Sequence, residues 1–248
     1  MAGGLYHRGS LEAEYYSRWT TLILSLMNQE MKRIIIVCEG ETEQEFLSDI
    51  LRQPFLSRGI LLNDPKIKYS NGGIVKWNPL KAQIERHLRE GDKPYVTTFI
   101  DYYGISDKHQ FPSWVEAHKI SDKSRRIDCL QHAMRNDIHE ELRSRFIPYI
   151  QLHEFEALLF INEESIVAAE IDCSIDRTKL RKVLADFPDP EMINNQKETS
   201  PSHRLEQIIT GYNKVLHGNI IALRIGLQHI REKAKRFNQW LSQLESIA

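Results

Sequence analysis

The chain has 248 residues, which is enough for one sizeable α/β domain or for a domain with a helical appendage. Its 41% hydrophobic and 27% charged residues suit a packed core beneath a charged surface. The formal net charge of −1 excludes a general attraction to polyanions. Any nucleic-acid contact must therefore come from a local basic patch, a bound metal or a partner.

The cysteines and the apolar stretches indicate the compartment. Cys38, Cys129 and Cys173 form neither a CxxC pair nor a zinc-ligand spacing, which favours a reducing environment. Residues 22–27 are apolar but too few to span a bilayer, and no small-residue cleavage site follows them. We therefore expect a cytoplasmic protein with no membrane segment.

Residues 1–30 differ from the rest of the chain and are interpreted as an N-terminal extension. Apolar residues recur at helical spacing from Leu11 to Leu26, which predicts an amphipathic helix over residues 11–28. The segment is either an extension that results from the choice of start site or a helix that docks on this domain or on another protein.

Strands and helices alternate after this segment. The β-branched run at residues 34–38 predicts a strand that is buried on both faces, followed by a helix up to Pro54. The other expected elements are a loop at 71–73, a helix over 80–90, a strand over 95–100 that ends at Asp101, an irregular stretch over 106–118, a helix over 127–142 and a strand over 146–152.

This order of elements predicts a three-layer α/β fold, in which helices flank a mainly parallel central sheet. Residues 31–162 are expected to form the α/β core. Residues 163–248 are expected to form a helical C-terminal portion packed on that core, with interruptions at Pro188, Pro190 and Pro201.

Acidic residues follow the expected strands. Glu39 lies at the end of the first, Asp101 at the end of the second, and Glu154 just after the third. Ligands of open α/β sheets gather at the carboxyl ends of strands, and crowded carboxylates bind Mg²⁺ or Mn²⁺ through hard oxygen atoms. The alternative is that such residues are solvated or stabilise helix ends, with Thr42 as a cap and Glu43 favouring the helix dipole.

Three stretches carry a resemblance to a known family. Residues 37–43, VCEGETE, resemble the strand-plus-EGxTE element of Toprim domains in the overcoming-lysogenization-defect nucleases and their relatives. Residues 98–104, TFIDYYG, look like the second Toprim element. Residues 145–160, RFIPYIQLHEFEALLF, resemble an uncharacterised bacterial family of Toprim-like proteins that is often encoded beside an ABC-type ATPase in defence-like gene clusters. Shorter stretches at 201–204, 212–214 and 225–227 extend the resemblance toward the C-terminus.

The resemblance implies a Toprim-like core and specific roles in a site for Mg²⁺ or Mn²⁺. Glu39 would be a metal ligand or general acid/base, supported by Glu43, and Asp101 would be the aspartate of the second element. Tyr103 stands where a second aspartate is common, which puts two-metal catalysis in doubt. Glu154 or Glu156 would supply the missing carboxylate, so that Glu39, Asp101, Glu154 and Glu156 are the candidate metal ligands. Glu39, Glu43, Asp101 and Glu154 are the candidate catalytic residues.

Other residues could take part in binding. His153 is either a base or metal ligand, or a structural histidine at a strand end. Lys76 could contact a phosphate. Lys233, Lys235 and Arg236 could touch a nucleic-acid backbone, although the same stretch could instead be an amphipathic helix that packs Ile225, Ile230, Phe237 and Trp240 into the core.

The resulting hypothesis is a metal-dependent nuclease that hydrolyses DNA or RNA, including tRNA. It would act as the effector of a bacterial anti-phage system with a separate ABC-type ATPase and could form a homo-oligomer. One alternative is a catalytically degenerate adaptor or sensor for the ATPase, and another is phosphotransfer on a small substrate. The chain has no P-loop and no nucleophile elbow, which argues against nucleotide hydrolysis and acyl transfer by this chain.

Overall fold

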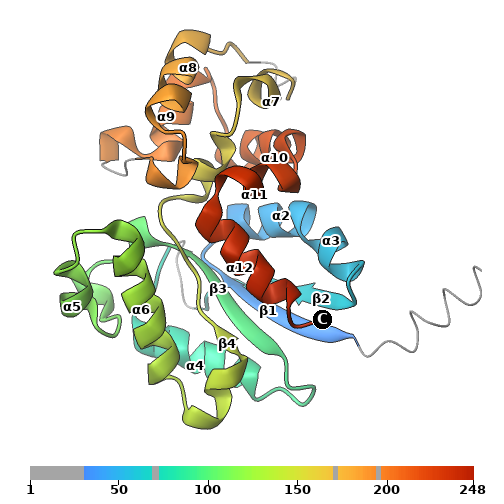
Figure 1. Ribbon diagram of the computed structural model, residues 1–248, viewed down its shortest axis with the longest axis vertical. Coiled ribbons are helices and arrows are strands. Elements are labelled where there is room, and N and C mark those ends of the chain that lie inside the picture. Colours follow the sequence, from blue (N-terminus) through green and yellow to red (C-terminus); the bar gives the residue numbers. More distant parts are fainter. Residues whose placement is uncertain (1–30, 69–72, 170–172, 194–196) are drawn as a thin grey trace, which may run out of the picture.

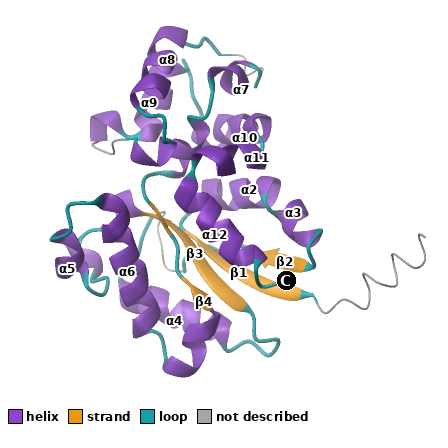
Figure 2. Cartoon of the chain, viewed as in Figure 1, coloured by secondary structure: helices purple, strands orange, loops and turns teal. Residues whose placement is uncertain are grey.

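The structure is a computed structural model that describes residues 31–68, 73–169, 173–193 and 197–248. The amphipathic helix expected at residues 11–28 and most of the loop expected at 71–73 lie outside the described residues. The described chain is an α/β fold with a parallel sheet flanked by helices, which confirms the predicted fold class (Figures 1 and 2).

Parallel pairing joins all the strands of the sheet. The order is β2-β1-β3-β4, and β5 also pairs with β3. The strands are β1 (Lys32–Cys38), β2 (Ile60–Asn63), β3 (Tyr95–Asp101), β4 (Phe146–Ile147) and β5 (Ile150–Gln151). In this order β1 and β3 lie at the centre of the sheet, between β2 on one side and β4 on the other.

Helices cover both faces of the sheet (Figure 1). Ile34 and Ile36 pack on one face against α2 (Glu41–Ile50), α3 (Arg52–Leu56) and α12 (Lys235–Glu245). Ile35 and Val37 pack on the other face against α4 (Trp77–Leu88) and α6 (Lys123–Asp137). Burial on both faces explains why β1 is a continuous apolar run rather than an alternating one.

The C-terminal helices complete the first of these two cores. The remaining helices are α5 (Trp114–His118), α7 (Glu163–Val167), α8 (Arg177–Asp186), α9 (Pro201–Ile208), α10 (Lys214–Ile225) and α11 (Leu227–Lys233). The short 3₁₀ helices are η1 (Tyr102–Gly104), η2 (Asp107–His109), η3 (Glu140–Arg145), η4 (Phe155–Leu159), η5 (Pro190–Met192) and η6 (Lys197–Thr199). Trp240 of α12 donates a hydrogen bond to Thr97 Oγ1 of β3 over 2.9 Å, and Asn219 of α10 donates to Glu45 Oε2 of α2 over 2.8 Å.

The structure differs from the bounds of three expected elements. Pro148 lacks an N–H group and divides the strand expected at 146–152 into β4 and β5. The helix expected over 127–142 ends at Asp137. The helix expected up to Pro54 ends at Ile50, and Pro54 lies in the first turn of α3, where a proline is tolerated.

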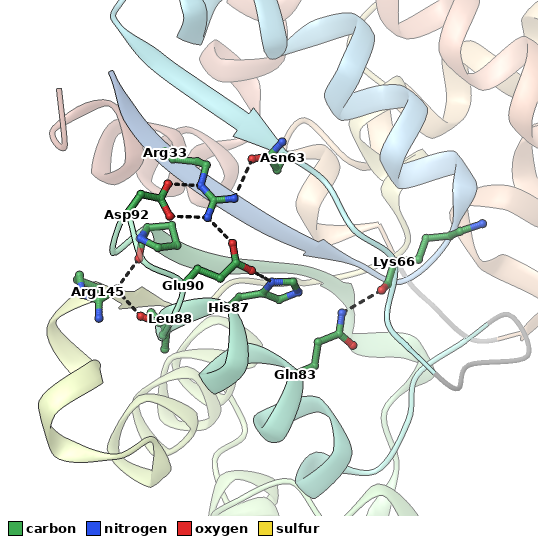
Figure 3. Close-up of polar contacts among 10 residues, drawn as sticks. Arg33, Asn63, Lys66, Gln83, His87, Leu88, Glu90, Asp92 and Arg145 are labelled. Atoms are coloured by element: carbon green, nitrogen blue, oxygen red, sulfur yellow. Dashed lines mark hydrogen bonds and ion pairs between the residues drawn. The ribbon is translucent and has the colours of Figure 1, made fainter. Parts of the chain in front are cut away.

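A polar network fixes the amino-terminal end of the sheet (Figure 3). Arg33 of β1 binds Glu90 and Asp92, with 2.7 Å between its Nη2 and Asp92 Oδ1. Arg145 donates to the carbonyl groups of Leu88 and Pro94. These contacts join β1 to the loop before β3. Among the described residues, no helix is long and apolar enough to cross a membrane.

Candidate functional site

The carboxyl ends of β1 and β3 form the point where the sheet reverses its connections. The chain leaves β1 toward β2 on one side and leaves β3 toward β4 on the other. Ligands of open α/β sheets bind in the crevice that such a reversal creates. Glu39 follows the last residue of β1, and Asp101 is the last residue of β3, so both lie where the connections reverse.

A direct hydrogen bond joins these two residues. The backbone N–H of Asp101 donates to Glu39 Oε2 over 3.1 Å. The Glu39 N–H in turn donates to the carbonyl oxygen of Phe99 over 3.3 Å, which continues the β1–β3 ladder by one step. The pairing of the two strands therefore places the Glu39 carboxylate against the Asp101 backbone.

Two glycines make room for the carboxylates. A Cβ atom on Gly40 would lie 3.0 Å from Glu43 Oε2, and one on Gly104 would lie 3.2 Å from Glu39 Oε1. Side-chain atoms at these distances would displace the carboxylates. The absence of a side chain at both positions thus lets the turn after β1 and the turn after β3 close around Glu39 and Glu43.

Glu156 and Lys214 complete the group from the C-terminal half. Glu156 lies in η4 with 0% of its surface exposed, and Lys214 is the first residue of α10. Lys214 Nζ lies 3.0 Å from Glu156 Oε1. We call Glu39, Glu43, Asp101, Glu156 and Lys214 the carboxylate cluster.

Glu39, Glu156 and Asp101 of this cluster are held in an environment that disfavours the charged form of their carboxyl groups. Burial raises the pKa of Glu39 to about 7; the hydrogen bond from Asp101 opposes this rise, and the charge of Glu43 adds to it. Burial also raises the pKa of Glu156 to about 7, against the opposing effect of Lys214. Burial, then Glu43 and Glu39, raises the pKa of Asp101 well above its usual range.

Lys214 is the positively charged member of the cluster. Burial acts to lower its pKa, but Glu156, Asp101 and Glu43 together outweigh burial and raise it. The ammonium group therefore stays protonated and compensates part of the negative charge. Its side chain is 41% exposed, so it also reaches solvent at the edge of the cluster.

Glu154, which the sequence grouped with these residues, is turned toward another partner. Its Oε2 accepts a hydrogen bond from the Ser202 N–H over 2.9 Å, at the first turn of α9. Its neighbour Glu156, by contrast, enters the carboxylate cluster. His153 is fully buried, and burial followed by the charge of Lys123 lowers its pKa to about 3, so its ring is neutral.

The cluster has the donor set of a hard cation, although the side chains are not closed around one. Among the described residues, no three His, Cys, Asp or Glu side chains stand in a ready-made metal-binding arrangement. Asp101 Oδ1 and Glu156 Oε2 are nevertheless buried and lack hydrogen-bond partners within the described part of the chain. Unpaired buried carboxylate oxygens are costly, and carboxylate oxygens are ligands of the kind that Mg²⁺ or Mn²⁺ takes.

Comparison with protein families decides where the chain belongs. Residues 38–245 match the family described as Domain of unknown function (DUF4276), which is well over half of the 248 residues. The chain belongs to the DUF4276 family. No curated protein and no solved structure matches this DUF4276 chain. The matched range contains every residue of the carboxylate cluster.

The basic residues proposed for nucleic-acid contact lie elsewhere on this DUF4276 chain. Lys76 is the exposed residue before α4, and Lys233 and Lys235 are exposed around the start of α12. Arg236 is largely covered, because its Nη1 lies 2.8 Å from Asp128 Oδ1 of α6. The alternative of apolar packing for this stretch is confirmed, since all four of its apolar residues are at most 2% exposed. They are Ile225, Ile230, Phe237 and Trp240.

Reasoning from the sequence did not assign Lys214 or Gly104 to the site. In the sequence, Lys214 belonged only to residues 212–214, which extend the resemblance, and to the basic residues of the C-terminal stretch. A local signal does exist: Asn213 caps α10 by accepting a hydrogen bond from the Leu216 N–H over 2.9 Å, which makes Lys214 the first residue of a helix.

A cavity of about 570 Å³ between α6 and the C-terminus lies at the Tyr95 end of β3, opposite to the carboxylate cluster.

The raised pKa values predict how stability depends on pH. In the folded protein Glu39 and Glu156 have a pKa of about 7 and keep their protons up to that pH. In the unfolded chain the pKa of a glutamate is 4.5, so the proton is lost at lower pH. Folding therefore binds protons between these values, and the free energy of unfolding should fall as the pH rises from about 4.5 to 7. Thermal unfolding across this range should show the decline, and Glu39→Gln should reduce its slope. Glu163→Gln, on an exposed ion pair with Arg181, should leave the slope unchanged.

Proposed function

We propose that this protein is a metal-dependent nuclease that hydrolyses phosphodiesters at the carboxylate cluster. The observation that supports the proposal is the gathering of four carboxylates, Glu39, Glu43, Asp101 and Glu156, at the carboxyl ends of β1 and β3. Neighbouring carboxylates disfavour each other's charged form, and carboxyl groups with strongly perturbed pKa values are frequent at functional sites.

In this proposal the cluster supplies metal ligands, a proton acceptor and a phosphate contact. Glu39, Asp101 and Glu156 would hold Mg²⁺ or Mn²⁺, which when bound supplies an activated water and neutralises charge on the phosphate. Glu39 Oε2 is held by the Asp101 N–H, which leaves Oε1 as the atom that can accept a proton from water. Lys214 reaches solvent and would contact a phosphate oxygen.

The direct experiment uses the purified full chain with Mg²⁺ or Mn²⁺ and three substrates: plasmid DNA, single-stranded DNA and tRNA. We expect cleavage of at least one substrate that depends on the metal and stops when EDTA is added. Persistent cleavage in EDTA would point to a contaminating or metal-independent activity and would oppose the proposal.

The adaptor function remains the second candidate, because Lys214 already supplies a positive charge inside the cluster. An adaptor or sensor for an ABC-type ATPase would retain the fold without metal-dependent cleavage. The ATPase partner and the anti-phage role are part of both candidates and rest on the sequence resemblance. Co-expression of the chain with the ATPase encoded beside it should yield a stable complex on size-exclusion chromatography.

A further inference from the structure

An aromatic surface begins one residue beyond the carboxylate cluster. Tyr102 directly follows Asp101, and its hydroxyl oxygen lies 3.2 Å from His118 Nε2. The ring centroids of Trp114 and His118 are 4.0 Å apart, and those of Tyr102 and Trp114 are 6.2 Å apart. Tyr102 and Trp114 are half-buried and His118 is exposed, so the three rings form a partly open platform.

Cationic residues lie close to this platform along the chain. Residues 114–126 carry Lys119, Lys123, Arg125 and Arg126 against Glu116 and Asp122, which is four positive and two negative charges on a chain of net charge −1. The Asp122 carboxylate is engaged as the cap of α6, where it accepts a hydrogen bond from the Arg125 N–H over 2.8 Å. Within the described residues, none of these four cations forms an ion pair with a carboxylate.

Arg126 links the cations to the platform. Its guanidinium donates to the Tyr102 hydroxyl over 3.4 Å and to the carbonyl oxygen of Ile120 over 2.8 Å. These neutral partners orient the group without neutralising its charge. Its charge therefore stays available to an anion that approaches the platform.

A buried histidine adds an unsatisfied polar group on the same side. Both ring nitrogens of His153 lack a hydrogen-bond partner within the described residues, although its side chain is fully buried. The charge of Lys123 acts on this ring. His153 follows β5, whose Gln151 pairs with Asp101 of β3, so the group lies beside the end of β3.

We infer that Tyr102, Trp114 and His118 stack unpaired bases while Lys119, Lys123, Arg125 and Arg126 bind phosphates, so that the substrate is single-stranded nucleic acid. Aromatic rings reach the faces of bases only where the bases are not paired and stacked in a duplex. The inference rests on the proposed function for its role in catalysis, because the platform would lead a strand to the carboxylate cluster through Tyr102.

Binding is measured by fluorescence anisotropy in EDTA, where no metal-dependent cleavage occurs. The probes are labelled oligouridine, labelled oligodeoxythymidine and a DNA duplex of the same length. We expect tighter binding to the single strands than to the duplex. Trp114→Ala should weaken single-strand binding by about tenfold to a hundredfold, the usual effect of losing a stacking aromatic. Trp114→Phe, which keeps a ring, should restore most of the affinity.

Matched variants distinguish the contributions of stacking and charge to binding from a general loss of structure. Lys123→Ala should lower the slope of log Kd against log salt by about 0.7, the contribution of one phosphate contact on a single strand. Val115→Ala, at an exposed neighbour on α5, and Lys182→Ala, on the distant α8, should change neither quantity. If Trp114→Ala fails to fold, the salt slope of Lys123→Ala decides the result.

Equal affinity for duplex and single strands, or unchanged binding in folded Trp114→Ala, would overturn the inference. Single-strand binding that depends on these residues in a chain without nuclease activity would support the inference and count against the proposed function. Metal-dependent cleavage that is unchanged in Trp114→Ala and Lys123→Ala would support the proposed function and count against the inference.

Discussion

Glu39→Gln should abolish metal-dependent cleavage while the protein remains folded. Glutamine keeps the size of the side chain and its reach to the Asp101 N–H, but it removes the charge that would hold a divalent cation. A bound metal contributes several kcal/mol of transition-state stabilisation, so we expect a loss of activity on the order of a thousandfold or more. Gel-based cleavage assays at saturating Mg²⁺ measure the effect, and circular dichroism checks the fold.

Two further variants make this prediction specific. Asp101→Asn should lose as much activity as Glu39→Gln, and the double variant should be little worse than either, because residues that act as one unit are not additive. Glu163→Gln applies the same chemical change to an exposed ion pair far from the cluster and should retain full activity. Full activity in folded Glu39→Gln would shift the assignment toward the adaptor function.

Lys214→Met should destabilise the protein through Glu156. Glu156 is fully buried, and the substitution removes the ammonium 3.0 Å from its Oε1. Loss of one partner from a fully buried pair costs about 3–5 kcal/mol, but 41% of the Lys214 side chain is exposed, so we expect about 1–2 kcal/mol at pH 8. The loss should be smaller at pH 5.5, where Glu156, with its pKa of about 7, is protonated. Urea denaturation of the wild type and of Lys214→Met at both pH values measures this loss of stability.

A double-mutant cycle and added metal test the cause of this destabilisation. Glu156→Gln should recover much of the stability in the Lys214→Met background, because it removes the uncompensated charge. Mg²⁺ should raise the melting temperature of Lys214→Met more than that of the wild type, since the ion would replace the missing ammonium. Lys182→Met on α8 is the matched control. Additive effects of Lys214→Met and Glu156→Gln would show that the two charges are not coupled.

The sequence predicted the parts of the site that depend on strand ends. The runs before Glu39 and Asp101 are rich in β-branched and aromatic residues and are buried on both faces, so both strands and their last residues could be predicted from the sequence. That Glu39 meets the backbone of Asp101 follows from the pairing of β1 with β3. The strand β2, which defines the other side of β1, was not predicted.

The remaining parts of the cluster depend on tertiary structure. Glu154 and Glu156 were both candidate metal ligands in the sequence, and only Glu154 was also a candidate catalytic residue. The turn of η4 places Glu156 in the cluster, while Glu154 binds the start of α9. Lys214 reaches the same place because α10 packs against α2 and η4. A single sequence carries no pattern that fixes this packing, so the lysine could be located only with the structure.

Binding of Mn²⁺ tests the central claim most directly, because it requires no knowledge of the substrate. Mn²⁺ titration of the full chain, followed by electron paramagnetic resonance, should show a bound ion in the wild type and in Glu163→Gln. Glu39→Gln and Asp101→Asn should lose that ion while remaining folded. Equal Mn²⁺ binding in all four proteins, or no binding to the wild type at saturating Mn²⁺, would contradict the assignment of the carboxylate cluster as a metal site.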